Sequence, residues 1–341
     1  MTPAQVSNPP NPWSASTIEW LDEPPPFKLH VYEETAKSIV ARNQSPDIGF
    51  GFSVNPYRGC FHGCAYCYAR PTHQYLDLGA GTDFERKIVV KTNAAELLKR
   101  EFEKRSWQGD EIVFSGVTDC YQPLEASYEI TRACLKVCLE YKNPVAIITK
   151  GALIRRDLDI LSALNRVAKV TVITSLAFSD DKVSRRIEPY APRPSIRLRA
   201  MKELCDAGIP VGVGVAPVIP GLNDSQIPEI LERAYDAGAR FSFLTLLRLP
   251  LEVKPVFIER LEREFPDRAK KVLSQVAAMK GGVLNRSEFG TRMHGDGPQW
   301  QAIEWLYEQT CRRLGMNIRE ESSPQRREST FERPISQLSL F

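Results

Sequence analysis

The sequence predicts an α/β fold, an open partial barrel of six parallel strands, and three observations support it. Short runs rich in apolar and β-branched residues alternate with helical segments between residues 49 and 247. Such alternation is typical of parallel βαβ units joined by right-handed crossovers. Six strands are too few for the usual eight-stranded closure, so the barrel is expected to stay open. Polar residues follow several strands, at the end where barrels of this kind carry their sites.

The expected elements follow in chain order. Asn93 and Glu96 resemble a capping box, and apolar residues then recur at helical spacing. Gly208 and Gly238 each follow a helical segment and are expected to end it. The six strands are expected at 49–54, 111–117, 145–149, 170–176, 211–215 and 241–247, and the helices between them at 93–105, 128–141, 157–167, 195–207 and 224–237.

The length suits one barrel with extensions at both ends. The chain has 341 residues, of which 43% are hydrophobic and 26% charged, which is ordinary globular composition. We expect a proline-rich leader at 1–26, the barrel at 48–250 and a helical extension at 251–318, with helices at 255–264, 267–279 and 299–314. Residues 319–341 are polar and are expected to form a flexible tail. Disorder should be confined to the two termini.

The charge balance and the apolar runs give no sign of a strongly basic nucleic-acid-binding protein or of a membrane-spanning protein. The net charge of +3 is close to zero, so composition alone gives no electrostatic indication of nucleic-acid binding. The longest apolar run, 211–219, is interrupted by glycine and proline and is too short to span a bilayer. The N-terminus carries no charged and then apolar leader, so a cytoplasmic protein with no membrane partner is expected.

The stretch 55–70, NPYRGCFHGCAYCYAR, organises the rest of the chain. It places Cys60, Cys64 and Cys67 in C-x-x-x-C-x-x-C spacing. Three thiolates can hold three irons of a [4Fe-4S] cluster and leave the fourth iron open. An open iron can chelate the amino and carboxylate groups of S-adenosylmethionine, and an electron passed through it can cleave the sulfonium to a 5'-deoxyadenosyl radical.

Two other interpretations of these cysteines are open. His62 or His73 could complete a Cys3His zinc site, although zinc motifs usually pair two knuckles and no second C-x-x-C is present. A disulfide is less favoured in a cytosolic chain. The remaining cysteines apart from Cys120 fall on apolar helix faces and are expected in the core, namely Cys134, Cys138, Cys205 and Cys311.

Several blocks together resemble a known family: NPYRGC-x-HGC-x-YCYAR, VTDCYQPLE, ITKGALIRRDLDIL, RRIEPYAPRPSIRL and PVIPGLND. From about 52 to 317 the chain is similar to the spore photoproduct lyase-like radical SAM family. The resemblance implies a partial (β/α)6 barrel, a [4Fe-4S] cluster and S-adenosylmethionine. It also implies that this cofactor is approached by Tyr66, Tyr68, Lys150, Ser175 and Ala216.

Structural interpretations of the same residues stay open. Lys150 could be a solvated strand end and Ser175 a satisfied hydroxyl, while Arg186 and Glu188 could form an ion pair near the rim. Cys120 follows the second strand and is a candidate hydrogen-atom donor, because thiol S–H bonds are weak enough to quench a carbon radical; the alternative is an inert rim thiol.

The expected function is that of a radical SAM enzyme that abstracts hydrogen from a nucleic-acid substrate, as a DNA repair lyase. A flavodoxin or ferredoxin would supply the electron. Two alternatives differ in class: a radical SAM enzyme acting on a peptide or small molecule, and a metal-binding module without turnover. The near-neutral net charge permits the first of these.

The chain ends in QLSLF, which resembles the short motif by which bacterial DNA polymerases and repair proteins bind the sliding clamp. The motif consists of Gln337, Leu338, Ser339, Leu340 and Phe341. Glutamine would anchor it by hydrogen bonds, and leucine and phenylalanine would fill an apolar pocket. A tethered peptide of this kind would raise the local concentration of the enzyme at DNA. Five-residue motifs also occur by chance, which is the alternative interpretation.

Overall fold

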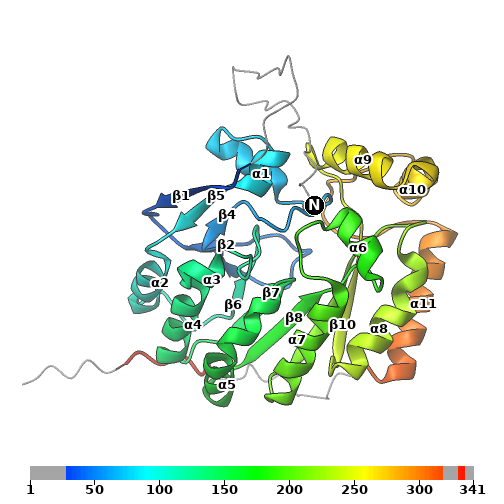
Figure 1. The fold of residues 1–341 in the computed structure, drawn as a ribbon. Coiled ribbons are helices and arrows are strands. Elements are labelled where there is room, and N and C mark those ends of the chain that lie inside the picture. The colour runs from blue at the N-terminus through cyan, green and yellow to red at the C-terminus, as the bar shows by residue number, and fades with distance from the viewer. Residues whose placement is uncertain (1–27, 318–328, 335–341) are drawn as a thin grey trace, which may run out of the picture.

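The computed structural model describes residues 28–317 and 329–334. In this part of the chain a seven-stranded sheet has the order β10-β9-β8-β7-β6-β3-β2. Its first six strands in that order run parallel, and β2 pairs antiparallel with β3 at the edge. The predicted six-stranded partial barrel is therefore confirmed (Figure 1). The strands are β2 (Val40–Arg42), β3 (Phe52–Val54), β6 (Ile112–Phe114), β7 (Val145–Thr149), β8 (Val170–Ser175), β9 (Val211–Val218) and β10 (Phe241–Leu246).

Helices cover the outside of this sheet (Figure 1). They are α2 (Ala94–Glu103), α3 (Glu125–Tyr128), α4 (Ile130–Glu140), α5 (Leu158–Val167), α6 (Asp181–Ile187), α7 (Pro194–Asp206), α8 (Ile227–Asp236) and α11 (Pro298–Leu314), with 3-10 turns η2 (Ala152–Asp157) and η3 (Asp224–Gln226). The helix expected at 128–141 is divided, because Glu129 has a left-handed φ of 51° between α3 and α4. None of the helices in the described residues is long and apolar enough to cross a membrane.

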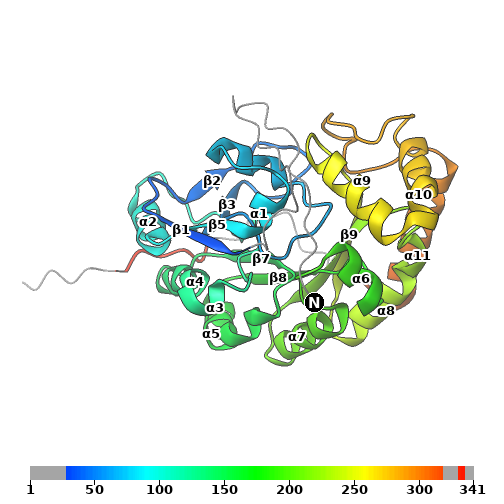
Figure 2. The same ribbon diagram turned by 45° about the horizontal axis from the view of Figure 1, so that its top comes forward.

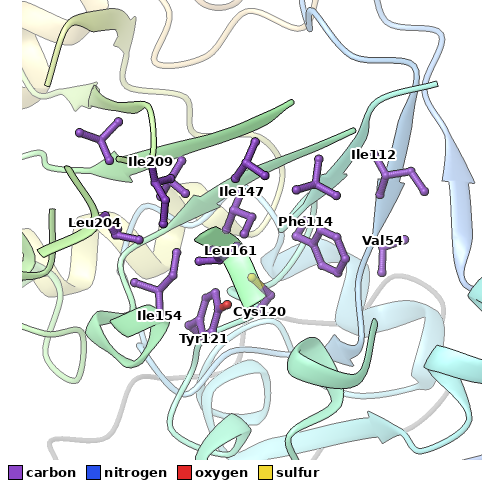
Figure 3. Close-up of a cluster of buried hydrophobic side chains, with 14 of the residues drawn as sticks. Val54, Ile112, Phe114, Cys120, Tyr121, Ile147, Ile154, Leu161, Leu204 and Ile209 are labelled. Carbon is purple, nitrogen blue, oxygen red and sulfur yellow. The ribbon is translucent and has the colours of Figure 1, made fainter. Parts of the chain in front are cut away.

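The inner core lies between the sheet and these helices. Figure 3 shows Phe114 of β6 and Ile147 of β7 in the cluster to which Leu161 of α5 also contributes, and all three side chains are fully buried. Strand residues of this kind are apolar on both faces, as expected of a parallel sheet covered by helices.

A second, three-stranded sheet was not predicted. It has the order β1-β5-β4 and consists of β1 (His30–Glu34), β5 (Lys87–Lys91) and β4 (Tyr57–Arg58). The cysteine stretch leaves β4 and continues into η1 (Arg70–Leu76) and α1 (Thr82–Arg86). The capping box at Asn93 was wrong: its side chain accepts from the N–H of Ala36 (2.9 Å) and donates to the Ala36 carbonyl (3.0 Å), so it fixes the segment after β1 instead.

The helical extension covers one side of the barrel mouth. Figure 2 shows α9 (Val253–Glu264) and α10 (Pro266–Ala278) on one side of the mouth, with α1 and the small sheet on the other. The glycine-rich stretch 281–297 then returns to β10, where the N–H of Leu246 donates to the carbonyl of Met293 (2.9 Å). The same stretch also contacts the loop before β3. There Asp47 accepts a hydrogen bond from the N–H of Gly290 (2.5 Å) and pairs with Arg292.

Part of the predicted flexible tail is anchored. Residues 329–334, which we call the strap, lie against the amino ends of β6 and β7, opposite the mouth. The Phe331 ring stacks on Tyr141, with centroids 6.1 Å apart, and meets Phe102 edge-on. Arg333 donates to the carbonyls of Phe102 (3.1 Å) and Lys104 (2.7 Å). The expected leader at 1–26 and the QLSLF motif lie outside the described residues.

Candidate functional site

The three cysteines of the motif converge at the mouth. Cys60 and Cys64 are buried, Cys67 is half-buried, and all three are free thiols. The loop is held by its own backbone and by neighbours: the N–H of Cys60 donates to the carbonyl of Phe84 (2.9 Å) and that of Cys67 to the carbonyl of Cys64 (3.2 Å). Burial raises the pKa of Cys60, and charges on Asp119 and the other two thiols raise it further. Three thiolates this close need a cationic partner such as iron.

Arg70 shapes the cysteine loop from behind. Its side chain is fully buried and donates to the carbonyls of Gly63 (3.2 Å), Cys64 (2.9 Å), Ala80 and Gly81 (3.0 Å each) and to Glu85 (2.5 Å). Gly63 has φ +64°, and a Cβ there would stand 3.1 Å from the Glu85 carboxylate. The turn between the first two cysteines therefore requires glycine.

The donor set fits an iron–sulfur cluster better than a zinc ion. Among the described residues, no three His, Cys, Asp or Glu side chains are grouped to hold one metal ion. The cysteines of a [4Fe-4S] cluster each bind a different iron and need no such grouping. The two histidines of the zinc alternative have other contacts: His62 Nδ1 faces Asp119 at 3.4 Å, and His73 Nε2 lies 2.8 Å from the carbonyl of Lys87.

Beside the cysteines, a buried polar cluster joins the carboxyl ends of β7 and β8 to the cysteine loop. Lys150 Nζ donates to Ser175 Oγ (2.9 Å) and lies 5.6 Å from the centre of the Tyr66 ring. The Tyr66 hydroxyl donates to Glu188, and the Ser175 hydroxyl lies 3.4 Å from the carbonyl of Ala216. The structure thus brings four of the five residues implied for S-adenosylmethionine together. Their role in binding it stays a prediction.

Arg197 and Glu188 complete this cluster, and the alternative that Arg186 pairs with Glu188 does not hold. Arg197 of α7 pairs with Glu188 and also donates to the carbonyl of Ser175 (3.1 Å). Arg186 instead donates to the carbonyl of Glu264 (3.1 Å). Burial alone would raise the pKa of Glu188, but the charges of Arg197 and Lys150 hold it below its ordinary value. Sequence reasoning missed Arg197, although it lies in the block RRIEPYAPRPSIRL.

The fifth implied residue, Tyr68, lies apart from the cluster. Its hydroxyl donates to the carbonyl of Gly116, and the side chain is 53% exposed at the mouth. Tyr66 and Tyr68 are two residues apart on one loop, yet one enters the buried cluster and the other faces the opening. A contact of Tyr68 with S-adenosylmethionine or with substrate is a prediction that stays open.

Cys120 does not reach the rim as expected. Its side chain is fully buried and points into the core toward Phe114, Ile147 and Leu161 (Figure 3). Its neighbour Asp119 takes the opposite direction and accepts hydrogen bonds from Thr149 Oγ1 (2.6 Å) and the N–H of Lys150 (2.7 Å). The predicted role of Cys120 as a hydrogen-atom donor stays untested, but its thiol has no open path to the mouth.

Comparison with known proteins agrees with this site. The family model of the Radical SAM superfamily matches residues 54–234. An uncharacterized protein of Mycobacterium tuberculosis is 37% identical over 241 residues, 69% of this chain and 70% of that protein. One of Methanocaldococcus jannaschii is 27% identical and covers 74% of this chain and 90% of its own length.

Solved structures of spore photoproduct lyase share the fold. A mutant form and a complex with dinucleoside spore photoproduct each superpose with a TM-score of 0.57 at 17% identity, covering 83% of this chain and 78% of theirs. At this identity the similarity concerns the fold, and it confirms the partial barrel expected from the resemblance. By its family match and its relatives, this chain belongs to the radical SAM superfamily, whose members use a [4Fe-4S] cluster and S-adenosylmethionine.

Proposed function

We propose that this radical SAM enzyme acts on a nucleic-acid substrate as a DNA repair lyase. One observation carries the proposal: the cysteine loop and the buried polar cluster lie side by side at the mouth of a barrel whose fold is shared with a lyase that is complexed with a dinucleoside. When bound, the cluster would deliver one electron to S-adenosylmethionine, and cleavage of the sulfonium would supply the radical that abstracts hydrogen.

The chain's own residues would hold and orient the cofactors. Cys60, Cys64 and Cys67 would ligate three irons, with Arg70 fixing the loop that carries them. Lys150 and Arg197 would attract the carboxylate of S-adenosylmethionine, and Glu188 its amino group. The burial of these charges strengthens each contact, because water does not screen them.

The test measures cleavage of S-adenosylmethionine and hydrogen abstraction from a nucleic acid in separate steps. The protein is reconstituted anaerobically with iron and sulfide, reduced, and assayed for release of 5'-deoxyadenosine from S-adenosylmethionine. Damaged and undamaged oligonucleotides are then added, and hydrogen transfer from deuterated DNA to 5'-deoxyadenosine is measured by mass spectrometry. Transfer of deuterium from DNA supports the proposal. Cleavage without transfer from any oligonucleotide would direct the search to a peptide or a small molecule.

The remaining alternative is a metal-binding module without turnover. It predicts bound metal and no 5'-deoxyadenosine under any reducing condition. Radical SAM enzymes take their electron from a donor protein, so reduced flavodoxin and ferredoxin should both be compared with dithionite in this assay.

We further propose that the terminal residues Gln337 to Phe341 bind the bacterial sliding clamp. The strap supports this proposal, because Phe331 and Arg333 fix the chain on the face opposite the mouth, a few residues before the motif begins. Calorimetry of the full chain with purified clamp tests it: micromolar binding is expected, and Leu340→Ala with Phe341→Ala should remove it. No heat of binding at high micromolar concentrations would show that the terminal motif is a chance match.

A further inference from the structure

A patch of alternating aromatic and cationic residues lies where the barrel is open. We call it the seam patch, and it consists of Tyr68, Arg248, Phe289 and Arg292. Arg248 follows the carboxyl end of β10, Tyr68 belongs to the cysteine loop, and the other two belong to the glycine-rich stretch. The Arg292 guanidinium lies over the Phe289 ring, and Arg248 is near enough to Arg292 and to Tyr68 for its charge to act on both. The patch therefore borders the cluster site.

Phe289 is held in place yet exposed to solvent. The ring is 60% exposed, and one of its faces is covered by the Arg292 guanidinium, 4.6 Å from the ring centre. Arg292 is itself fixed by Asp47 and by Ser45 Oγ (2.5 Å), and the N–H of Gly290 is fixed by Asp47. An apolar ring presented on a fixed backbone has a free face for stacking. Stacking of a nucleobase on an aromatic side chain is worth about 1–3 kcal/mol.

Arg248 is short of partners for its charge. Its Nε is buried and has no hydrogen-bond partner among the described residues. The carboxylate that acts on it, Asp47, is already engaged by Arg292 and by the N–H of Gly290. Lys280 lies behind Arg248, fully buried, and donates to the carbonyl of Arg292 (3.2 Å).

The other charges around Arg248 do not neutralise it. Asp296, the acid that faces Lys280, pairs with Arg286. The described groups around Arg248 therefore comprise four cations against two carboxylates: Arg248, Lys280, Arg286 and Arg292 against Asp47 and Asp296. One phosphodiester at Arg248 would reduce this excess of two positive charges to one.

We propose that the seam patch binds a single-stranded segment of nucleic acid, with one phosphodiester on Arg248 and the adjoining base stacked on the free face of Phe289. The inference rests on the proposed function and specifies how its substrate is held. A base that reacts beside the buried polar cluster must leave the duplex stack, either by flipping out or because its segment is single-stranded. In a single-stranded segment the adjoining base is also free to stack on Phe289. With one arginine offered to the backbone, few phosphates are contacted. This agrees with the small net charge of the chain.

Fluorescence anisotropy tests the inference with a labelled 12-nucleotide DNA, the RNA of the same sequence, and the DNA duplex, each titrated with the full chain across a salt series. Single strands are expected to bind more tightly than the duplex. Whichever of the DNA and RNA single strands binds more tightly identifies the kind of nucleic acid that the seam patch prefers. Phe289→Ala should weaken single-strand binding about 5- to 160-fold with an unchanged salt slope. Arg248→Ala should weaken it and lower the slope by about 0.7, one phosphate contact on a single strand.

Matched controls are available on other faces. Trp305 of α11 is 62% exposed, and Arg166 lies exposed in the last turn of α5, so Trp305→Ala and Arg166→Ala remove the same kinds of side chain elsewhere. Both should leave binding unchanged. Equal binding by wild type, Arg248→Ala and Phe289→Ala would overturn the inference, as would an equal loss in the two controls. Thermal unfolding of every variant shows that each is folded.

Two readouts keep the inference separate from the proposed function. Binding is measured without turnover, and 5'-deoxyadenosine release is measured without nucleic acid. If cleavage fails while Arg248→Ala and Phe289→Ala still weaken binding, the proposed chemistry is wrong and the seam patch stands. If cleavage of S-adenosylmethionine occurs and neither variant changes binding, the seam patch does not bind nucleic acid and the inference is wrong.

Discussion

The two sides of the barrel mouth arrange their charges in opposite ways. On the cluster side, Glu188 and Arg197 are buried, Lys150 is half-buried, and each has a charged or hydrogen-bonding partner. On the seam side, Arg248 has no carboxylate of its own among the described residues, and Phe289 exposes a ring face. Buried charges must be paired to be tolerated, and pairing fixes their geometry. The comparison suggests that the cluster side is built for one invariant cofactor and the seam side for a substrate that arrives with its own charge.

The largest effect should come from removing the cluster ligands. Replacing Cys60, Cys64 and Cys67 with alanine should abolish iron binding and the release of 5'-deoxyadenosine, because the iron then has no thiolate ligands at this loop. Iron and sulfide content and visible absorption measure it. Cys205→Ala serves as the control, since that thiol lies on α7 away from the mouth. Stoichiometric zinc without iron in anaerobically reconstituted wild type would contradict the prediction.

The next effect tests the pairing on the cluster side. Arg197→Met leaves Glu188 buried without its main cation, and breaking a buried pair in this way costs about 3–5 kcal/mol in the free energy of unfolding. Denaturant unfolding of the apo-protein measures the loss.

Lys202→Met is the matched control, because Lys202 forms an exposed pair with Asp206 on the same helix. Exposed pairs contribute about 0–1 kcal/mol. Similar losses of unfolding free energy in Arg197→Met and Lys202→Met would mean that the buried pair contributes no more than the exposed one. The contrast drawn between the cluster side and the seam side would then be wrong.

A smaller effect concerns the face opposite the mouth. Phe331→Ala removes a half-buried ring from Phe102 and Tyr141, and we expect a loss of about 1–2 kcal/mol in unfolding free energy. Cofactor cleavage should persist, since the strap lies at the amino ends of the strands. A folded Phe331→Ala variant that no longer cleaved S-adenosylmethionine would contradict this prediction, because it would show that the strap affects the site at the mouth.

The last effect lies in the pH dependence of the free energy of unfolding on the seam side. Burial, and then the charges of Arg248 and Arg286, lower the pKa of Lys280 from 10.5 to about 8. Between these values the unfolded chain binds more protons than the folded one, so Lys280 should make stability rise with pH over this window. In Lys280→Met this contribution to the rise is lost. The free energy of unfolding of wild type minus that of the variant should therefore increase with pH over this window. Lys271→Met, exposed on α10, is the control, and parallel curves for Lys280→Met and wild type would contradict the assignment.

Local pattern predicted the barrel well and the contacts between distant segments poorly. The strands at 145–149 and 170–176 and the helices at 157–167 and 195–207 were predicted within a few residues, because apolar periodicity is a local property. The short helix α6, which directly follows β8, was not predicted. The small sheet was missed because β4 has two residues and β1 is mostly exposed. Arg197 was missed and Arg186 was offered as the partner of Glu188, because sequence spacing does not show which way α6 and α7 turn. Cys120 was placed at the rim because it follows the second strand, but the position of a residue in a loop does not show whether its side chain points to the mouth or into the core.

The contact between Asp47 and the glycine-rich stretch has a consequence for how the molecule folds and opens. Asp47 and Arg292 are 245 residues apart in the chain, and Gly290 is 243 residues from Asp47. Loop closure over such a separation is entropically costly, so this contact should form after the sheet and be the first to break. Native-state hydrogen exchange should therefore show the amide of Gly290 exchanging through a partial opening, at lower free energy than the amides of β7 and β8. The glycine-rich stretch would then detach from the loop before β3 while the barrel that holds the cofactors stays folded.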